Sequence, residues 1–311
     1  MTQIPLIIDG DPGVDDAIAL LLAFGSPELE ILGVTTTMGN VGPELTARNA
    51  RIIRQIAGRE EVPVHAGARL PLVRAPVEAG HFHGQSGLGT LPIFEPAAPA
   101  GAQHAANFIV EAVMARPPGT VSLAVMGPMT NLALALRLEP TLAGRLKQVV
   151  AMGGARREGG NITASAEFNI FADPHAAHVV AESGANLVML GLDATHQVRS
   201  TPARRAAIAA LKGPVAAAAT TLLAFSLDTE RRLVGDDDPP LHDPCTIAYV
   251  LRPDLFETHP CRMDVEIASE LAQGHTAVDL RLSDGISPNA RWAVKAQADG
   301  VYALLTERLA R

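Results

Sequence analysis

The chain has 311 residues, of which 48% are hydrophobic and 19% charged, and its formal net charge is −8. A chain of this length buries a large core, and we expect one α/β domain over residues 1–311. The acidic balance argues against a nucleic-acid partner, and no apolar run approaches the length of a membrane span. Two cysteines are too few for a disulfide framework, so we expect a cytoplasmic protein.

The first predicted element is a buried strand over residues 4–8, which leads directly into an acidic turn. Gly10, Pro12 and Gly13 favour a sharp turn, and apolar residues recur with helical spacing from Val14 onward. The turn and the start of the helix hold the carboxylates of Asp9, Asp11, Asp15 and Asp16. Like charges this close repel each other unless they share a cation or a proton, so the turn predicts a functional site.

Strands and helices then alternate along the chain. We expect strands at 30–36, 62–66, 121–126, 149–152 and 187–192, and helices at 43–57, 102–116, 129–138 and 173–183. This order predicts a mostly parallel open sheet with helices on both faces, a Rossmann-like α/β fold. Ligands of such sheets bind beyond the carboxyl ends of the strands, where the acidic turn lies. Residues 67–101 lack periodicity and predict a long functional loop.

The last third of the chain begins with an alanine-rich helical segment over 202–232. An acidic run at 236–238 precedes two prolines, and we interpret it as solvated surface. A helix starts at His242-Asp243-Pro244. Residues 263–267, 276–280 and 292–294 predict antiparallel strands appended to the sheet, and 300–309 predicts a closing helix.

Several side chains offer only oxygen atoms as ligands: Asp11, Asp15, Asp16 and the distant Asp243. Such a set, without His or Cys, favours Mg²⁺, Mn²⁺ or Ca²⁺ over zinc. One irregular segment adds amide and carboxylate groups that suit sugar hydroxyls, namely Asn161, Glu167 and Asn169. No P-loop or dinucleotide fingerprint is present. A sugar diol bound beside a calcium ion is therefore the favoured ligand.

Short motifs of a recognisable kind lie along nearly the whole chain: Asp9 to Ala17, Thr35 to Asn40, His83-Gly84, Gly127 to Asn131, Met152 to Gly154, Ala166 to Asp173, Gly191 to Asp193 and His242 to Cys245. Together they resemble the inosine-uridine preferring nucleoside hydrolases. The resemblance implies a Ca²⁺ enzyme that cleaves the N-glycosidic bond of ribonucleosides. It also implies a homodimer or homotetramer, as is common among relatives.

The resemblance further implies roles for single residues. The metal ligands would be Asp11, Asp16, Asp243 and the backbone carbonyl of Met126, and Asp15 would be the base that activates water. The ribose would be held by Asn40, Asn161, Glu167 and Asn169, with Phe168 in the same loop. His83 and His242 would lie near the nucleobase, and His242 would help it to leave. Some relatives carry tyrosines before the His-Asp-Pro motif, where this chain has only Phe225.

Two other functions fit part of the pattern. A haloacid-dehalogenase-like phosphatase also begins with a strand followed by Asp-x-Asp and would use Asp9 as nucleophile with Mg²⁺. The step Pro12-Gly13 and the extra pair Asp15-Asp16 fit it poorly. A nucleoside- or ribose-binding protein without turnover needs no base, so Asp15 and His242 argue against it.

Overall fold

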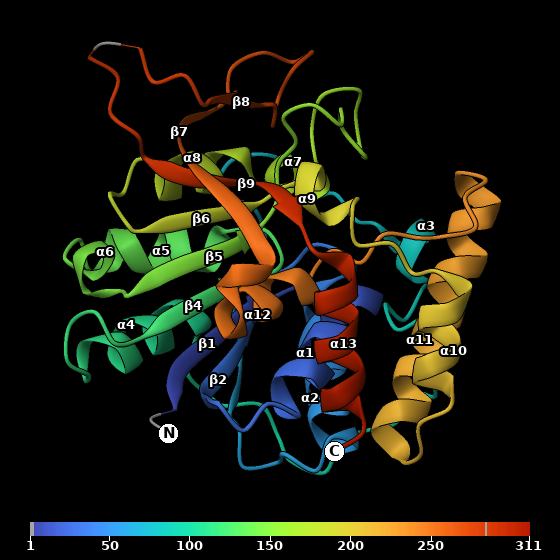
Figure 1. Ribbon diagram of the computed structural model, residues 1–311. Coiled ribbons are helices and arrows are strands. Elements are labelled where there is room, and N and C mark those ends of the chain that lie inside the picture. The colour runs from blue at the N-terminus through green and yellow to red at the C-terminus, as the bar shows by residue number, and fades with distance from the viewer. Residues whose placement is uncertain (1–2, 284) are drawn as a thin grey trace.

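A twisted sheet of nine strands forms the centre of the molecule within residues 3–283 and 285–311, which this computed structural model describes (Figure 1). The strands are β1 (Ile4–Gly10), β2 (Leu29–Thr36), β3 (Val64–Ala66), β4 (Ser122–Val125), β5 (Gln148–Met152), β6 (Leu187–Leu190), β7 (Phe256–Val265), β8 (Thr276–Asp279) and β9 (Ala290–Ala296). Their order across the sheet is β3-β2-β1-β4-β5-β6-β9-β7-β8.

The first six strands pair in parallel, which confirms the predicted fold class. At the other end, β7 pairs antiparallel with both β8 and β9. Strand β9 differs in part from the sequence prediction, because it also pairs in parallel with β6. It therefore joins the parallel and antiparallel parts of the sheet. Strand β7 begins at Phe256, well before the expected start at Met263.

Helices cover both faces of the sheet (Figure 1). One core cluster contains residues of α1 (Val14–Phe24), α2 (Pro43–Ile56), α11 (Pro214–Leu233), α12 (Pro244–Leu251) and α13 (Ala298–Leu309). The other contains residues of α4 (Ala105–Met114), α5 (Thr130–Leu138) and α8 (Pro174–Ala181). Helix α10 (Pro202–Ala209) packs beside α11. Among the described residues, no helix combines the length and apolarity that a membrane span requires.

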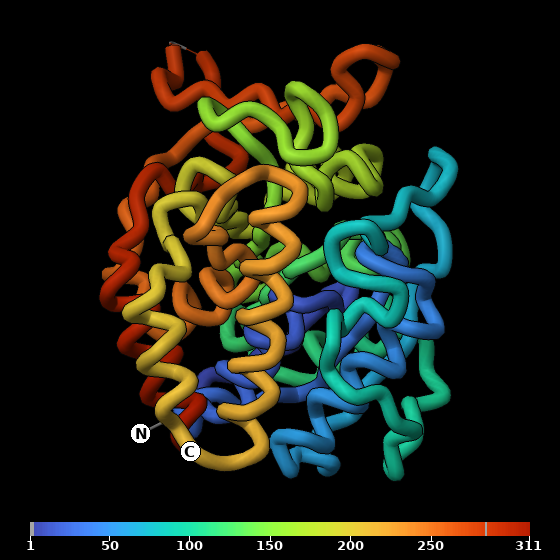
Figure 2. Tube along the Cα trace, turned by 90° about the vertical axis from the view of Figure 1, so that its right-hand side faces the viewer, coloured from blue at the N-terminus to red at the C-terminus, as the bar shows by residue number. Residues whose placement is uncertain are grey.

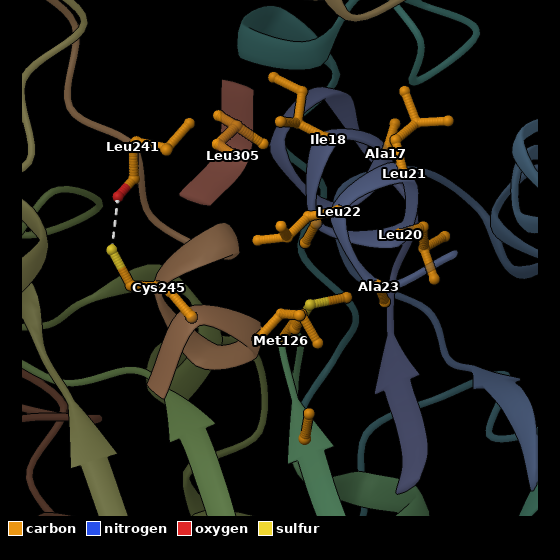
Figure 3. Packing of buried hydrophobic residues seen from close by; sticks show 14 of the residues in the cluster. Ala17, Ile18, Leu20, Leu21, Leu22, Ala23, Met126, Leu241, Cys245 and Leu305 are labelled. Atoms are coloured by element: carbon orange, nitrogen blue, oxygen red, sulfur yellow. Dashed lines mark hydrogen bonds between the residues drawn. The ribbon is translucent and has the colours of Figure 1, made fainter. Parts of the chain in front are cut away.

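The side chains of β1 show how one strand serves both cores. Leu6 and Ile8 belong to the cluster that includes α1, and Ile7 belongs to the opposite cluster, as the alternation of a strand requires. Figure 3 shows part of the first cluster, in which labelled residues of α1 lie together with Met126, Leu241, Cys245 and Leu305 from other elements. Both cysteines are buried and unpaired. The strand that leads into the acidic turn is therefore packed on both of its faces.

Short helices lie in parts of the chain for which the sequence predicted no helix. They are α3 (Gly80–His83), α6 (Leu142–Arg145), α7 (Phe168–Ala172), α9 (Leu192–Thr195) and the 3₁₀ helix η1 (Pro253–Leu255). Helix α3 lies within the long 67–101 segment and contacts α11. In Figure 2 this segment, coloured cyan to teal, lies beside α11. Segments far apart in the sequence thus meet at the carboxyl ends of the strands.

Candidate active site

A cavity of about 580 Å³ lies beyond the ends of β1, β4 and β5. This volume is in the range of small-molecule sites. Every site residue predicted from the sequence lines the cavity except Asp11 and Asp16, which are fully buried. The predicted residues come from β-strand ends, α1, α3, α7 and the start of α12. The fold therefore brings them together at one place.

The acidic turn is shaped by close approaches that only glycine permits. The Asp16 carboxylate accepts hydrogen bonds from the backbone N–H groups of Asp11 at 3.1 Å and Gly13 at 2.9 Å. A Cβ atom at Gly13 would lie 2.6 Å from both Asn40 Nδ2 and His83 Nδ1. A Cβ atom at Gly10 would lie 2.7 Å from Asp16 Oδ1. The two glycines thus leave room for the side chains that surround the turn.

Asp11 has one carboxylate oxygen that lacks a hydrogen-bond partner. Its Oδ2 accepts from the backbone N–H of Asn40 at 2.7 Å, whereas its buried Oδ1 accepts from no described residue. Cβ atoms at Gly39 and Gly127 would collide with this carboxylate, so it is enclosed by backbone. Buried polar atoms are normally satisfied, and an unsatisfied carboxylate oxygen indicates a missing ligand.

The remaining carboxylates of the set form a compact cluster. Asp15, Asp16 and Asp243 each offer an oxygen atom, and these atoms lie within 4.8 Å of one another. Burial raises the pKa of Asp16 to about 7, helped by the charge of Asp15. Burial likewise raises the pKa values of Asp11 and Asp243 well above the usual range. A divalent cation would offset both the desolvation and the mutual repulsion, so the donor set fits a metal ion.

The backbone carbonyl of Met126 lies at the same edge of the sheet. It accepts a hydrogen bond from Asn169 Nδ2 at 3.0 Å, and the same amide donates to the carbonyl of Met152 at 3.2 Å. A carbonyl oxygen has two lone pairs, so this one keeps the capacity to bind a cation.

The other polar residues of the cavity hold the local backbone in place. Glu167 caps α7, because its carboxylate accepts from the N–H groups of Gly154 and Asn169 at 2.9 Å and of Ile170 at 3.2 Å. Burial raises its pKa. Asn161 Oδ1 accepts from the N–H of Phe168 at 2.9 Å. These bonds fix the direction of side chains that the sequence assigned to ribose.

Two histidines face the acidic cluster. His83 Nδ1 accepts from the N–H of Val14 at 3.1 Å, and burial lowers the pKa of the imidazole. His242 Nδ1 lies 2.9 Å from the hydroxyl of Thr195. Burial lowers the pKa of His242 to about 4, although Asp15 opposes this effect. Both rings are therefore neutral at neutral pH, and each can offer one N–H to a ligand.

Some cavity residues were not assigned to the site from the sequence: His81, Phe82, His196, Glu230, Leu233 and Val234. One signal was available for Glu230. Helix α11 buries Ala219 and Leu222, and the same face continues through Ser226 to Glu230. A buried carboxylate at the end of an apolar helix face is unusual and indicates a functional position.

Asp9, the nucleophile of the phosphatase alternative, is not among the residues that line the cavity. Its Oδ1 accepts from Thr35 Oγ1 at 2.6 Å and from Asn131 Nδ2 at 2.8 Å. Asn131 also donates to the carbonyl of Thr36 at 3.0 Å and accepts from the N–H of Ala68 at 2.8 Å. Asp9 and Asn131 thus cross-link the strand ends, and a phosphatase mechanism through Asp9 is disfavoured.

None of the aspartates at 236–238 lines the cavity or belongs to the carboxylate cluster. Asp236 pairs with Arg199, and Asp237 pairs with Arg231 at 2.6 Å. Asp237 is exposed. These ion pairs tie the end of α11 to its surroundings.

Comparison with known proteins identifies the protein class to which this fold and cavity belong. Residues 6–303 match the family model described as inosine-uridine preferring nucleoside hydrolase. The fold and the cavity therefore define a nucleoside hydrolase, a glycosidase that acts on N-glycosidic bonds. The chain belongs to the inosine-uridine preferring nucleoside hydrolase family, which confirms the resemblance seen in its motifs.

Individual relatives agree over nearly the full length of the chain. An inosine-uridine preferring nucleoside hydrolase from Leishmania major is 38% identical over 98% of this chain and 97% of its own. A pyrimidine-specific ribonucleoside hydrolase from Enterobacter sp. (strain 638) is 40% identical over 99% of this chain and 98% of its own. The solved structure of a plant nucleoside hydrolase superimposes with a TM-score of 0.93 at 30% identity, covering 99% of both chains.

Proposed function

We propose that this protein hydrolyses the N-glycosidic bond of ribonucleosides with the help of a bound Ca²⁺ ion, releasing the free nucleobase and ribose. The observation that carries the proposal is the acidic cluster at a nucleoside-sized cavity, in which Asp16 and Asp243 can bind a cation and Asp15, as the base, offers an oxygen atom within 4.8 Å of theirs. The unsatisfied Oδ1 of Asp11 supports it.

The proposed ligands of the cation are the side chains of Asp11, Asp16 and Asp243 and the carbonyl of Met126. An all-oxygen set that includes a neutral carbonyl suits Ca²⁺, which takes roughly six to eight oxygen ligands in flexible geometry. When bound, the ion would hold the sugar hydroxyls and make a nearby water easier to deprotonate. Asn40 supports the set, since its Nδ2 donates to Asp16 Oδ2 at 3.0 Å.

Asp15 is the proposed general base. Its carboxylate lines the cavity and makes no hydrogen bond to another described side chain or backbone group, so it is free to accept a proton. General bases contribute roughly 10²–10⁴-fold to rate. In the proposed step, Asp15 takes a proton from water, the water oxygen bonds to the anomeric carbon, and the C–N bond breaks.

The remaining residues serve the two ends of the substrate. The electron pair of the broken bond goes to the departing base, and an N–H of His242 stabilises it. Positive charge develops on the ribose in such reactions. Carboxylates nearby stabilise that charge, and Asn40, Asn161, Glu167 and Asn169 hold the hydroxyls, with Phe168 against the sugar.

We also propose that the enzyme acts in nucleoside salvage in the cytoplasm as a homodimer or homotetramer. The two buried free thiols suit a reducing compartment. Apolar side chains exposed on the 67–101 segment, namely Leu70, Leu72, Val73, Ile93 and Phe94, support contact with a second copy. Sedimentation analysis measures the assembly directly.

One assay tests the proposed reaction against both alternatives. The purified protein is incubated with Ca²⁺ and inosine, uridine or p-nitrophenyl phosphate, and free ribose and phosphate are measured. Release of ribose from a nucleoside, lost with a chelator and restored by Ca²⁺, is expected. Release of phosphate alone would favour the phosphatase, and binding of nucleosides without ribose release would favour a binding protein.

A further inference from the structure

Helix α11 presents a buried carboxylate to the cavity. Glu230 is 8% exposed, lines the cavity, and also borders a smaller adjoining void of about 20 Å³ together with Ser226 and His242. Its side chain makes no hydrogen bond or ion pair with any residue that the structure describes. By contrast, Glu158 nearby is paired with His196 at 2.9 Å. The Glu230 carboxylate is therefore available to accept hydrogen bonds from a ligand in the cavity.

No positively charged side chain among the described residues forms an ion pair with the Glu230 carboxylate. Burial raises the pKa of Glu230, and the charge of Asp236 adds to the effect, whereas Arg199 and His196 oppose it. Arg199 is already paired with Asp236. The carboxylate oxygens therefore remain open to the cavity, where a ligand can donate hydrogen bonds to them.

The position of Glu230 indicates which part of a substrate it meets. Under the proposed function, the ribose lies against Asp15 and the amides of Asn40 and Asn169. The lining supplied by α3 and α11 includes Phe82 and Leu233, whose apolar side chains suit a flat aromatic ring. Glu230 lies in this second part of the wall.

We propose that the Glu230 carboxylate accepts hydrogen bonds from the nucleobase and makes guanosine the preferred purine substrate. This inference rests on the proposed function. A carboxylate has two parallel acceptor oxygens and no donor, so it matches a base edge that presents two adjacent N–H groups. Guanine offers N1–H beside its 2-amino group. Hypoxanthine has the same N1–H but carries C2–H in place of the amino group, so it can donate only one of the two N–H hydrogen bonds to the carboxylate.

The test compares kcat/KM for guanosine, inosine and p-nitrophenyl ribofuranoside in the wild type and in Glu230→Gln. The amide keeps the size of the side chain but replaces one acceptor with a donor, which suits hypoxanthine and repels the guanine amino group. We expect the guanosine-to-inosine ratio to fall by about tenfold or more, within the range for bidentate base contacts. Hydrolysis of p-nitrophenyl ribofuranoside should change by less than about twofold, since it lacks a base edge.

Asp228→Asn is the matched control, because it makes the same chemical change at an exposed position of α11. It should leave the ratio unchanged. Glu230→Leu, which removes the polar atoms from a buried position, should also abolish the preference for guanosine and serves if the Gln variant folds poorly.

The assignment is overturned if wild-type protein prefers inosine to guanosine, or if the ratio is the same in Glu230→Gln. Equal losses on all three substrates would also overturn it, because they would indicate a structural role. If the wild type hydrolyses none of them, the proposed function fails instead. In that case, calorimetry measures the affinities of guanine and hypoxanthine for the wild type and for Glu230→Gln. A lower affinity of the variant for guanine would support the role of Glu230 independently of catalysis, and equal affinities would exclude it.

Discussion

Nδ1 of His83 lies 4.0 Å from Oδ1 of Asp15, and the same nitrogen accepts a hydrogen bond from the N–H of Val14. Because Nδ1 is an acceptor, the proton of the neutral ring is on Nε2. Burial lowers the pKa of His83, which keeps the ring neutral. The histidine therefore lies beside the proposed base without forming a charged pair with it, and Asp15 remains available to take a proton.

Replacing Asp15 with Asn should remove the general base and little else. The amide has the size of the carboxylate but accepts no proton, so kcat should fall by about 10²-fold or more. The metal content and the melting temperature should stay close to those of the wild type, because Asp15 is not a proposed ligand. A variant with near wild-type kcat on its best nucleoside would exclude Asp15 as the base.

Replacing Asp243 with Ala should release the cation. Asp243 is buried in the acidic cluster, and the other carboxylates would then lack the ligand that completes the set. Elemental analysis after dialysis against Ca²⁺-free buffer should find little calcium, and activity should be lost. Asp237→Ala, at an exposed ion pair with Arg231, is the control and should retain both. Full calcium content in the Asp243 variant would show that the ligand set is wrong.

The acidic turn could be predicted from the sequence because its residues are contiguous. A buried strand, two glycines and the start of a helix place Asp11, Asp15 and Asp16 at a strand end whatever the rest of the fold does. Asp243 comes from a distant helix start, so the sequence could name it as an oxygen ligand, but its position next to the acidic turn follows only from the fold. Periodicity gives the type of each element, but it does not say which helix approaches which strand end.

Helix α11 illustrates that limit. Its spacing shows which face is buried, but only the fold shows that this face ends at the cavity, with Glu230 in the wall and Phe225 outside it. Phe225 packs on the loop after α3, where a Cβ at Gly89 would collide with its ring. The mixed pairing of β9 was missed for a similar reason, because a strand pattern does not reveal the direction of both neighbours.

Asn131 should matter for stability more than for chemistry. Its amide joins Asp9, the carbonyl of Thr36 and the N–H of Ala68. Asn131→Ala leaves these buried groups unpaired, at a cost of about 2–4 kcal/mol, and should lower the melting temperature by about 5 °C or more. Asn186→Ala, where an exposed amide donates to the carbonyl of Lys147 at 2.9 Å, should change it little. Equal shifts in the two variants would contradict the cross-linking role.

His242 should assist the departing nucleobase rather than bind the cation. Burial holds its pKa at about 4, so at neutral pH the ring is uncharged and acts through one N–H. The Thr195 hydroxyl lies 2.9 Å from Nδ1, and when it donates there the remaining N–H is on Nε2. A departing purine or pyrimidine accumulates negative charge and gains from that N–H, whereas p-nitrophenolate is stable without it.

His242→Ala should therefore slow inosine hydrolysis by about tenfold or more relative to hydrolysis of p-nitrophenyl ribofuranoside. Asp15→Asn should slow both substrates alike, because the base acts on water in either reaction. Thr195→Val removes the hydroxyl that fixes the tautomer and should show the His242 pattern in weaker form. If His242→Ala slows the two substrates equally, the imidazole positions the sugar or the backbone, and the proton for the departing base comes from another group in the cavity.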